Sequence, residues 1–324
     1  MRKEDNLKLN VTETEGIFAF FLAFFVALLL GFVLVFVPEG NIQVVLNYAV
    51  TQVAYLIVPL IFLQFIKKQD YLTTIHAKGK IKPLGLLLTL PIAIGSIMQN
   101  TIFVVCFNWL LELVGVTPSV SLPQIDTPLN IILALLAVVI LPPLAEESLF
   151  RGVILNSYEH HGIMKATFLS ALVFALSHFN PAQFVHQFIL GALLAFLVLT
   201  TGSIWYSVVI HLLNNLISLF IGEVIPAYNA LATFNTTNVL ILIAMFVVGA
   251  IILILSTMAF NRLCAKDNLV IKGNPFKIFS KEKAPEYHEN DGEKLSSQAI
   301  GFIAFLVVAS IFVTIIEIVA KELT

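Results

Sequence analysis

Residues 129–151 read LNIILALLAVVILPPLAEESLFR, and this stretch decides the class of fold. Its apolar part forms most of a helix that crosses a membrane, which needs about 20 predominantly apolar residues. The stretch ends, however, on two adjacent acids, Glu146 and Glu147, with Arg151 four residues after the second. One charged side chain at the centre of a membrane helix costs about 2.5 to 3.5 kcal/mol, so charges retained at this depth indicate a functional site.

The composition of the whole chain places this helix in a polytopic membrane protein. Of 324 residues, 59% are hydrophobic and only 12% are charged, which exceeds the apolar share of soluble domains. The lipid bilayer is therefore the first predicted partner, and nothing in the chain indicates nucleic acid. Cys106 and Cys264 lie in an apolar stretch and a basic one, so they predict neither a disulfide nor a metal site.

Apolar stretches of about 20 residues predict an all-α transmembrane bundle of about nine spans, with 1–324 as a single membrane domain. The nine run approximately over Gly16–Val37, Ile42–Ile66, Leu84–Val116, Leu129–Leu155, Ile163–His178, Phe184–Leu199, Ile204–Gly222, Val239–Phe260 and Ala299–Ala320. The third contains Pro91 and Gly95 and is too long for a straight crossing, so we expect a kink or a strong tilt there.

The basic residues predict how these helices are oriented. If the N-terminus is cytoplasmic, 17 of the 18 Lys and Arg residues fall on the inner side, Arg151 among them, and only Lys321 lies outside. Cytoplasmic segments of membrane proteins are enriched in Lys and Arg, so we expect the N-terminus inside and the C-terminus outside. The polar segment 261–297 is then a cytoplasmic loop.

The spacing within the acidic motif gives its two glutamates different roles. Glu147 and Arg151 are i,i+4 neighbours on one helical face and can neutralise each other. Glu146 projects about 100° away round the helix and has no cation on that helix, which leaves it available for chemistry. The alternative is that both glutamates only form interhelical hydrogen bonds, or lie at the cytoplasmic interface.

Two histidines on later helices are the other main candidates. His178 stands just before a proline that ends the fifth helix, where it could be a general base, a metal ligand or an interfacial residue. His211 and Asn215 are i,i+4 neighbours, so an imidazole and a carboxamide face the same way and can address one polar atom together. A single hydrogen bond between helices is the simpler alternative for that pair.

The remaining polar side chains in the apolar segments are weaker candidates. His186 is equally consistent with a supporting role, a pore lining or a packing hydrogen bond. Ser96, Gln99 and Asn100 form a stripe that is more typical of hydrogen bonds between helices than of a site. The histidine pair 160–161 follows the fourth span in a polar turn and is expected to be solvated.

Three short motifs appear in order on successive spans: Glu146-Glu147-x-x-x-Arg151, Phe174-x-x-x-His178 and His211-x-x-x-Asn215. Together they resemble the CPBP family, also called the CAAX protease and bacteriocin-processing or Abi family of intramembrane proteases, which is related to the Ras-converting CAAX endopeptidases. The resemblance covers roughly residues 129–222 and implies a catalytic four-helix core there. It implies that Glu146 activates water with His178 as its partner. His211 and Asn215 would stabilise the oxyanion, with Glu147 and Arg151 in support.

The role of a metal stays open, because this family is often described as one of metalloproteases. Glu146, His178 and His211 could form a His₂Glu zinc set, with water as the fourth ligand. The chain has no His-Glu-x-x-His helix, however, and the two histidines come from separate helices. We therefore favour a glutamate mechanism without a cofactor, and keep zinc as the alternative.

The predicted function is an intramembrane endopeptidase that hydrolyses a membrane-associated peptide or protein near the cytoplasmic side of a cell membrane, expected to be the bacterial plasma membrane. The alternative is a non-catalytic protein, such as a bacteriocin self-immunity factor or scaffold, that kept the helical core. A proton-coupled transporter that uses Glu146 and His178 as relay groups is less well supported, because the chain has no internal repeat.

The protease prediction sets one structural requirement. His178 would lie about 24 Å along the fifth helix from its cytoplasmic end, whereas His211 is only about seven residues into a helix that starts from the same side. The two can share a site with Glu146 only if the fifth and sixth helices are short or tilted. We therefore expect the turn at Asn180 and Pro181 to be buried beneath the outer surface of the membrane.

Overall fold

The computed structural model describes residues 11–116, 122–233, 235–265 and 294–322, and these form a bundle of helices without a strand. Seven long apolar helices are continuous: α1 (Glu13–Val33), α2 (Asn41–Ile61), α4 (Pro83–Leu113), α9 (Pro181–Thr201), α10 (Trp205–Val224), α12 (Thr236–Cys264) and α13 (Ser297–Glu322). An eighth runs over Pro128–His161 and is built from several helical pieces. The predicted all-α membrane bundle is confirmed. Most of the predicted loop 261–297 falls outside the described residues.

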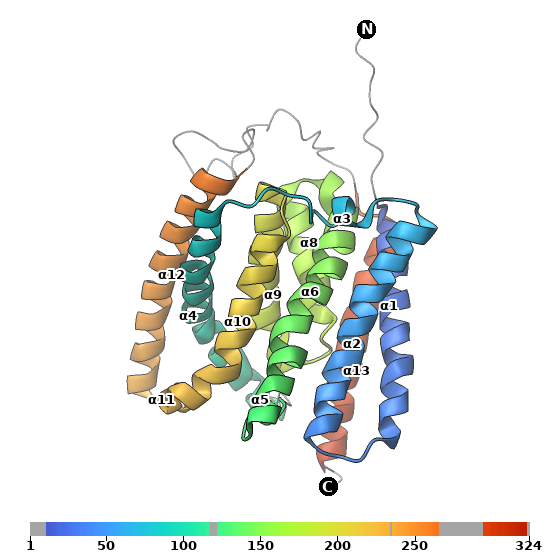
Figure 1. Ribbon diagram of the computed structural model, residues 1–324. Helices are drawn as coiled ribbons and strands as arrows, with labels where there is room; N and C mark the ends of the chain where they lie inside the picture. The colour runs from blue at the N-terminus through green and yellow to red at the C-terminus, as the bar shows by residue number, and fades with distance from the viewer. Residues whose placement is uncertain (1–10, 117–121, 234, 266–293, 323–324) are drawn as a thin grey trace.

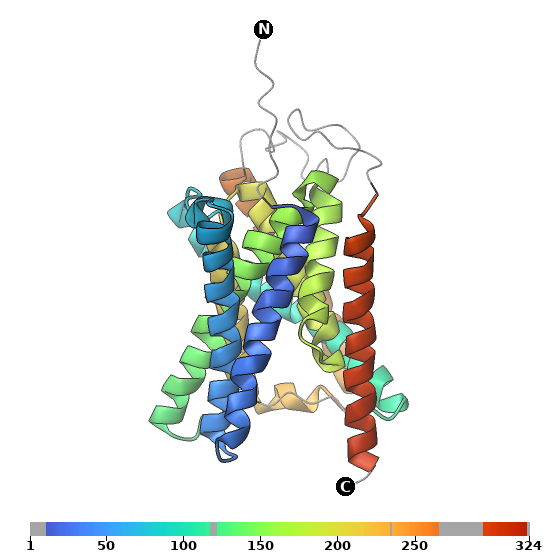
Figure 2. The same cartoon turned by 90° about the vertical axis from the view of Figure 1, so that its right-hand side faces the viewer.

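The fifth predicted span, Ile163–His178, corresponds to α8 (Ile163–Leu176), which is helical but has only 14 residues. At 1.5 Å per residue it reaches about 21 Å, which is too short to cross a hydrocarbon core of about 30 Å. The described residues thus contain eight helices of membrane-spanning length, and α8 is an apolar helix that falls short of that length. The turn between α8 and α9 therefore lies well above the lower ends of α1, α2 and α13, as Figure 2 shows. The requirement for a short fifth helix is met.

Local signals in the sequence set the boundaries of these helices. Thr127 caps the helix that begins at Pro128 by accepting a hydrogen bond from the backbone of Asn130, and the proline occupies the first helical position. Asn180 and Pro181 start α9 in the same way, with Ala182 as the donor. At the other end of α9, Gly202 adopts a left-handed conformation with φ of 68°.

Small residues let α4 and α12 pack closely together, as Figure 1 shows on one side of the bundle. A side chain at Gly95 would come within 2.7 Å of the backbone nitrogen of Leu253, and one at Gly249 within 2.6 Å of that of Gln99. Membrane helices use such positions because burial of apolar surface supplies little attraction in lipid. With 31 residues, α4 exceeds a straight crossing, and it passes obliquely through the bundle, as expected (Figures 1 and 2).

The helix that carries the glutamates departs from regular α geometry in two π-helical stretches and in a final 3₁₀ turn. It runs through α5 (Pro128–Ala134), the π-helical η3 (Leu135–Ile140), α6 (Leu141–Glu146), the π-helical η4 (Glu147–Ile154), α7 (Leu155–Tyr158) and η5 (Glu159–His161). Pro142 and Pro143 have no N–H, so the carbonyls of Val138 and Val139 lose their usual donors four residues on. Wide turns of this kind occur often at functional sites.

Candidate active site

The predicted ion pair in the acidic motif is present and fully buried. Nε of Arg151 lies 3.2 Å from Oε2 of Glu147, and neither side chain is exposed. The other oxygen, Oε1 of Glu147, accepts a hydrogen bond from Nδ1 of His211 at 2.9 Å. One carboxylate thus holds both a guanidinium of its own helix and the imidazole of α10.

The surroundings of Arg151 fix its guanidinium in the interior. Nη2 donates to the carbonyl of Gly191 on α9 at 3.3 Å. The guanidinium carbon also lies 4.3 Å from the centroid of the Phe174 ring, which is a cation–π contact. Because Arg151 is buried and paired with Glu147, it does not belong among the cytoplasmic charges, and it gives no support to the predicted orientation.

Glu146 lies apart from that ion pair, as the helical spacing predicts. Its Oε1 accepts a hydrogen bond from Nε2 of Gln52 on α2 at 2.9 Å, and its Oε2 lies 3.7 Å from Nε2 of His211. The side chains of Glu146 and Gln52 are both buried. Gln52 was not among the predicted site residues. The only signal for it in the sequence is an amide inside an apolar span, and such amides usually serve packing.

His178 projects from the end of the short helix α8 toward the same place. Its Nδ1 donates to the carbonyl of Phe174 at 2.8 Å, so the proton of the neutral ring is on Nδ1 and the lone pair is on Nε2. The ring of Phe174 contacts both imidazoles edge to face, with centroids 5.0 Å from His178 and 6.0 Å from His211. His178 and Glu146 line the same cavity.

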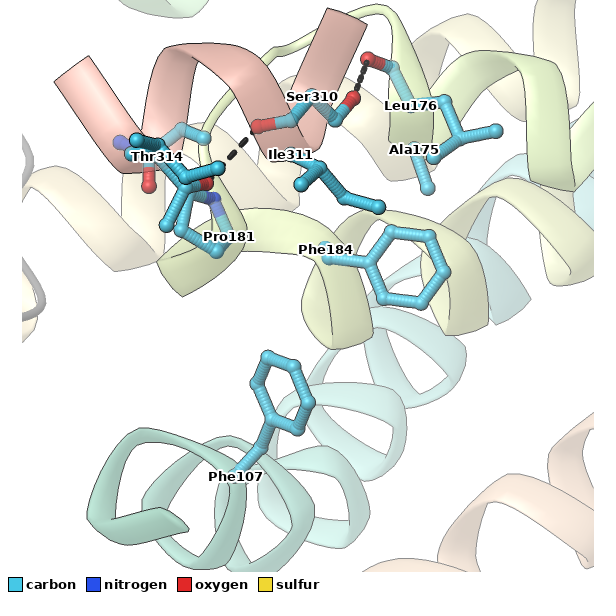
Figure 3. Close-up of a pocket in the computed structure, with 10 residues that line it drawn as sticks. Phe107, Ala175, Leu176, Pro181, Phe184, Ser310, Ile311 and Thr314 are labelled. Carbon is cyan, nitrogen blue, oxygen red and sulfur yellow. Dashed lines mark hydrogen bonds between the residues drawn. The ribbon is translucent and has the colours of Figure 1, made fainter. Parts of the chain in front are cut away.

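The turn that carries His178 is held by the C-terminal helix. Phe179 follows in a left-handed conformation with φ of 48°, which is rare for a residue with a bulky side chain and often marks a functional turn. Figure 3 shows Ser310 of α13 beside the end of α8, where its hydroxyl donates to the carbonyl of Leu176 at 3.3 Å. That carbonyl also accepts from the backbone N–H of Phe179 at 3.1 Å, and the Ser310 hydroxyl also lies 2.8 Å from the carbonyl of Leu306, so α13 adds a contact to the turn.

Asn215 has a clear structural role in addition to the predicted one. Its Nδ2 donates to the carbonyl of Val138 at 3.0 Å, which is one of the two carbonyls that the proline pair deprives of a donor. An amide nitrogen carries two hydrogens, so one remains for a ligand. Asn215 and His211 both line the same cavity, as their i,i+4 spacing suggests.

His186 belongs to a hydrogen-bonded layer between helices. Its Nδ1 lies 2.9 Å from the amide of Asn100 on α4, and its Nε2 lies 3.2 Å from the amide of Asn214 on α10. Of the polar stripe on α4, Asn100 thus forms the expected hydrogen bond between helices. His186 also lines the cavity, so the side chain that links α4, α9 and α10 forms part of the cavity wall.

A cavity of about 1170 Å³ extends from Glu146 into one half of the bundle. It is lined mainly by apolar side chains, with Glu146, His178, His211, Asn214, Asn215, Gln183 and Gln187 among the polar ones. Most lining residues of α1, α2 and α4 come from the halves of those helices that lie farther from the N-terminus of α1, and Gln52, Tyr55 and Ile97 lie just beyond the midpoints. Helix α11 (Pro226–Ala230) contributes at the lower end in Figure 1. The cavity therefore extends away from the end where the chain begins.

Glu146, His178 and His211 do not form a compact metal-binding set in this structure. Among the described residues, the one group of three His, Cys, Asp or Glu residues whose ligand atoms all lie within 4.8 Å of one another consists of Glu13, His160 and His161. In addition, Nδ1 of His211 is bound to Glu147, and only Nε2 faces Glu146. The arrangement does not fit the predicted zinc set, so we derive no step through zinc at Glu146.

The fold and the site together define a polytopic membrane protein in which a buried glutamate and two histidines line a large cavity. Residues 128–217 match the family described as type II CAAX prenyl endopeptidase Rce1-like. This match confirms the resemblance to the CAAX protease family for the segment that contains the three motifs. It indicates a membrane protease with a protein or peptide substrate. No curated protein and no solved structure is significantly similar to the chain.

Proposed function

We propose that this protein is an intramembrane endopeptidase in which Glu146 activates water for attack on a peptide bond. The observation that carries the proposal is the different environment of the two adjacent glutamates. Glu147 is paired with Arg151, whereas the Glu146 carboxylate faces a large cavity with Gln52 on one oxygen and His211 near the other. A carboxylate held in this way has an oxygen available for the proton of a water.

The contacts of His211 support a role in charge stabilisation. With Nδ1 donating to the Glu147 carboxylate, a neutral ring would point its Nε2 lone pair at Glu146. Two such acceptors repel each other, so we propose that His211 carries a second proton on Nε2 when the reaction begins. In the proposed reaction, an Nε2–H of His211 donates to the oxyanion that forms when water adds to the carbonyl. Preorganised donors of this type each contribute about 10² to 10³ in rate.

The other residues complete the reaction as follows. Glu146 takes a proton from the attacking water, assisted by the Nε2 lone pair of His178, and the remaining amide hydrogen of Asn215 donates to the oxyanion. Glu146 then returns the proton to the leaving nitrogen as the C–N bond breaks. Gln52 positions the Glu146 carboxylate throughout. Glu147 and Arg151 hold His211 in place.

The cavity also bears on where the substrate approaches. With the predicted orientation, the half of the bundle that contains the cavity is the outer half, so we propose cleavage from the outer side of the bacterial plasma membrane. This differs from the cytoplasmic side expected from the sequence. The apolar lining with scattered amides suits an extended peptide or an unwound segment of a membrane protein.

The test is a search for new protein termini. Proteoliposomes that contain membrane-protein extract and either wild type or Glu146→Gln are compared by labelling of free amino ends and mass spectrometry, with a prenylated CAAX peptide as a second probe. We expect termini that depend on Glu146. The same termini with folded Glu146→Gln would instead favour a non-catalytic immunity factor or scaffold.

A further inference from the structure

A second cluster of ionisable side chains lies at the end of the bundle where α1 begins. Glu13, in the first turn of α1, directs Oε1 at both histidines of the η5 turn: Nε2 of His161 lies 2.6 Å away and Nε2 of His160 lies 3.4 Å away. The two imidazole centroids are 4.0 Å apart. Glu13 and His161 are buried, and none of the three lines the cavity. The expectation that these histidines are solvated is wrong for His161.

The donor set of this cluster suits a transition-metal ion. Two imidazole nitrogens and one carboxylate oxygen are ligands that zinc accepts, and three protein ligands with a water complete a tetrahedron. Ligands about 2.0 to 2.2 Å from zinc lie about 3.3 Å apart in that geometry. The separation of 3.4 Å between His160 and Glu13 already matches, and the shorter contact with His161 must widen by less than 1 Å.

The second oxygen of Glu13 is fixed in the way that metal-binding carboxylates often are. Oε2 accepts hydrogen bonds from the backbone nitrogen and the hydroxyl of Ser296, the residue that precedes α13. Such partners orient a ligand and are worth about 10- to 100-fold in metal affinity. The packing beneath is also close, because a side chain at Gly16 would come within 2.7 Å of Oγ of Ser157 on α7. The carboxylate and the histidine turn are therefore held together.

We propose that Glu13, His160 and His161 bind a divalent transition-metal ion, with zinc as the probe, and that this ion ties the start of α1 to the end of the glutamate-bearing helix and to the start of α13. Both connections bear on the active site. The helix that ends at His161 carries Glu146, and α13 supports the turn of His178 through Ser310. The site is structural, and it is separate from any metal at Glu146.

The experiment measures zinc binding by the full-length protein in detergent, after removal of metal with a chelator. All variants carry Glu146→Gln, so that the alternative zinc set at Glu146 loses a ligand. Bound zinc is counted by mass spectrometry after dialysis, the absorption of Co²⁺ reports coordination, and the unfolding midpoint is recorded with and without zinc. Glu13→Gln and His161→Gln test the site. His76→Gln is the matched control, because His76 pairs with Glu159 at 3.2 Å at the same end of the molecule.

We expect about one zinc per chain in the parent and in His76→Gln, with a tetrahedral Co²⁺ spectrum and a higher unfolding midpoint in zinc. Glu13→Gln and His161→Gln should lower the affinity at least tenfold and abolish the rise in midpoint. If either variant fails to fold, His160→Gln replaces it, because His160 is the more exposed of the two histidines. Absence of zinc binding, or binding unchanged in the site variants, would overturn the proposal.

Discussion

Gln52→Leu is the substitution that tests the proposed site most selectively. The change keeps the size of the side chain but removes the donor that holds Oε1 of Glu146 at 2.9 Å. Hydrogen bonds to charged groups contribute about 1.5 to 3 kcal/mol. If the bond orients the carboxylate for its reaction with water, its loss lowers the rate by about 10- to 100-fold, at about 1.4 kcal/mol for each factor of ten.

The assay is the rate of peptide cleavage in proteoliposomes, with kcat and KM determined separately. A residue that positions the base should affect kcat much more than KM. Gln43→Leu is the control, because Gln43 lies on the same helix and donates to the backbone carbonyls of Leu34 and Val37, away from Glu146. A wild-type kcat for Gln52→Leu would refute the positioning role. So would a loss of activity no larger than the loss of folded protein, or an equal loss in Gln43→Leu.

Two further predictions concern the support of the site. Arg151→Met leaves the fully buried Glu147 carboxylate without its cation, so we expect a loss of about 3 to 5 kcal/mol in unfolding free energy, measured by denaturation in mixed micelles; a stability equal to wild type would contradict the role of the ion pair. Gly191→Ala places a Cβ 3.0 Å from Cδ1 of Phe174 and 3.2 Å from Cα of Ala171, so α8 and α9 must separate slightly. We expect a loss of about 1 to 3 kcal/mol and reduced cleavage, whereas Gly301→Ala, where the added Cβ has no neighbour within 4 Å, should be neutral in the same measurements.

The local parts of the site could be predicted from the sequence. Glu147 and Arg151 are four residues apart in one helix, and helical geometry alone brings them together, even in a π-helical stretch. The rise per residue of an α-helix also indicated that α8 had to be short or tilted, because His178 could not otherwise reach Glu146 and His211. A contact between neighbours on one helix can be predicted from the sequence. So can the length of a helix when its end must reach a site on another helix.

The contacts that the sequence did not reveal come from distant helices. Gln52 meets Glu146 across 94 residues, and nothing in the spacing of α2 indicates that its amide faces a carboxylate. The second role of Asn215 depends on the carbonyl that Pro142 leaves without a donor, so it needs the relative position of α10 and η3. His161 looks like a solvated loop residue until α1 is placed against it. In each case tertiary packing decides the environment of the side chain.

Chelation experiments on this protein need one precaution. If the cluster of Glu13, His160 and His161 binds a metal, a chelator can reduce activity by loosening α1 and α13 without any metal at Glu146. The comparison should therefore include His161→Gln, in which that structural site is disabled. Loss of activity on chelation in this variant, restored by zinc, would contradict a metal-free mechanism.

The most direct test of the central claim is the single-turnover cleavage rate of Glu146→Gln against that of Glu112→Gln, an exposed acid on α4. General bases contribute about 10² to 10⁴ in rate. We predict that Glu146→Gln is slower than wild type by at least about 100-fold while it remains folded, and that Glu112→Gln cleaves at the wild-type rate. A folded Glu146→Gln protein that cleaves at the wild-type rate would contradict the assignment of Glu146 as the base.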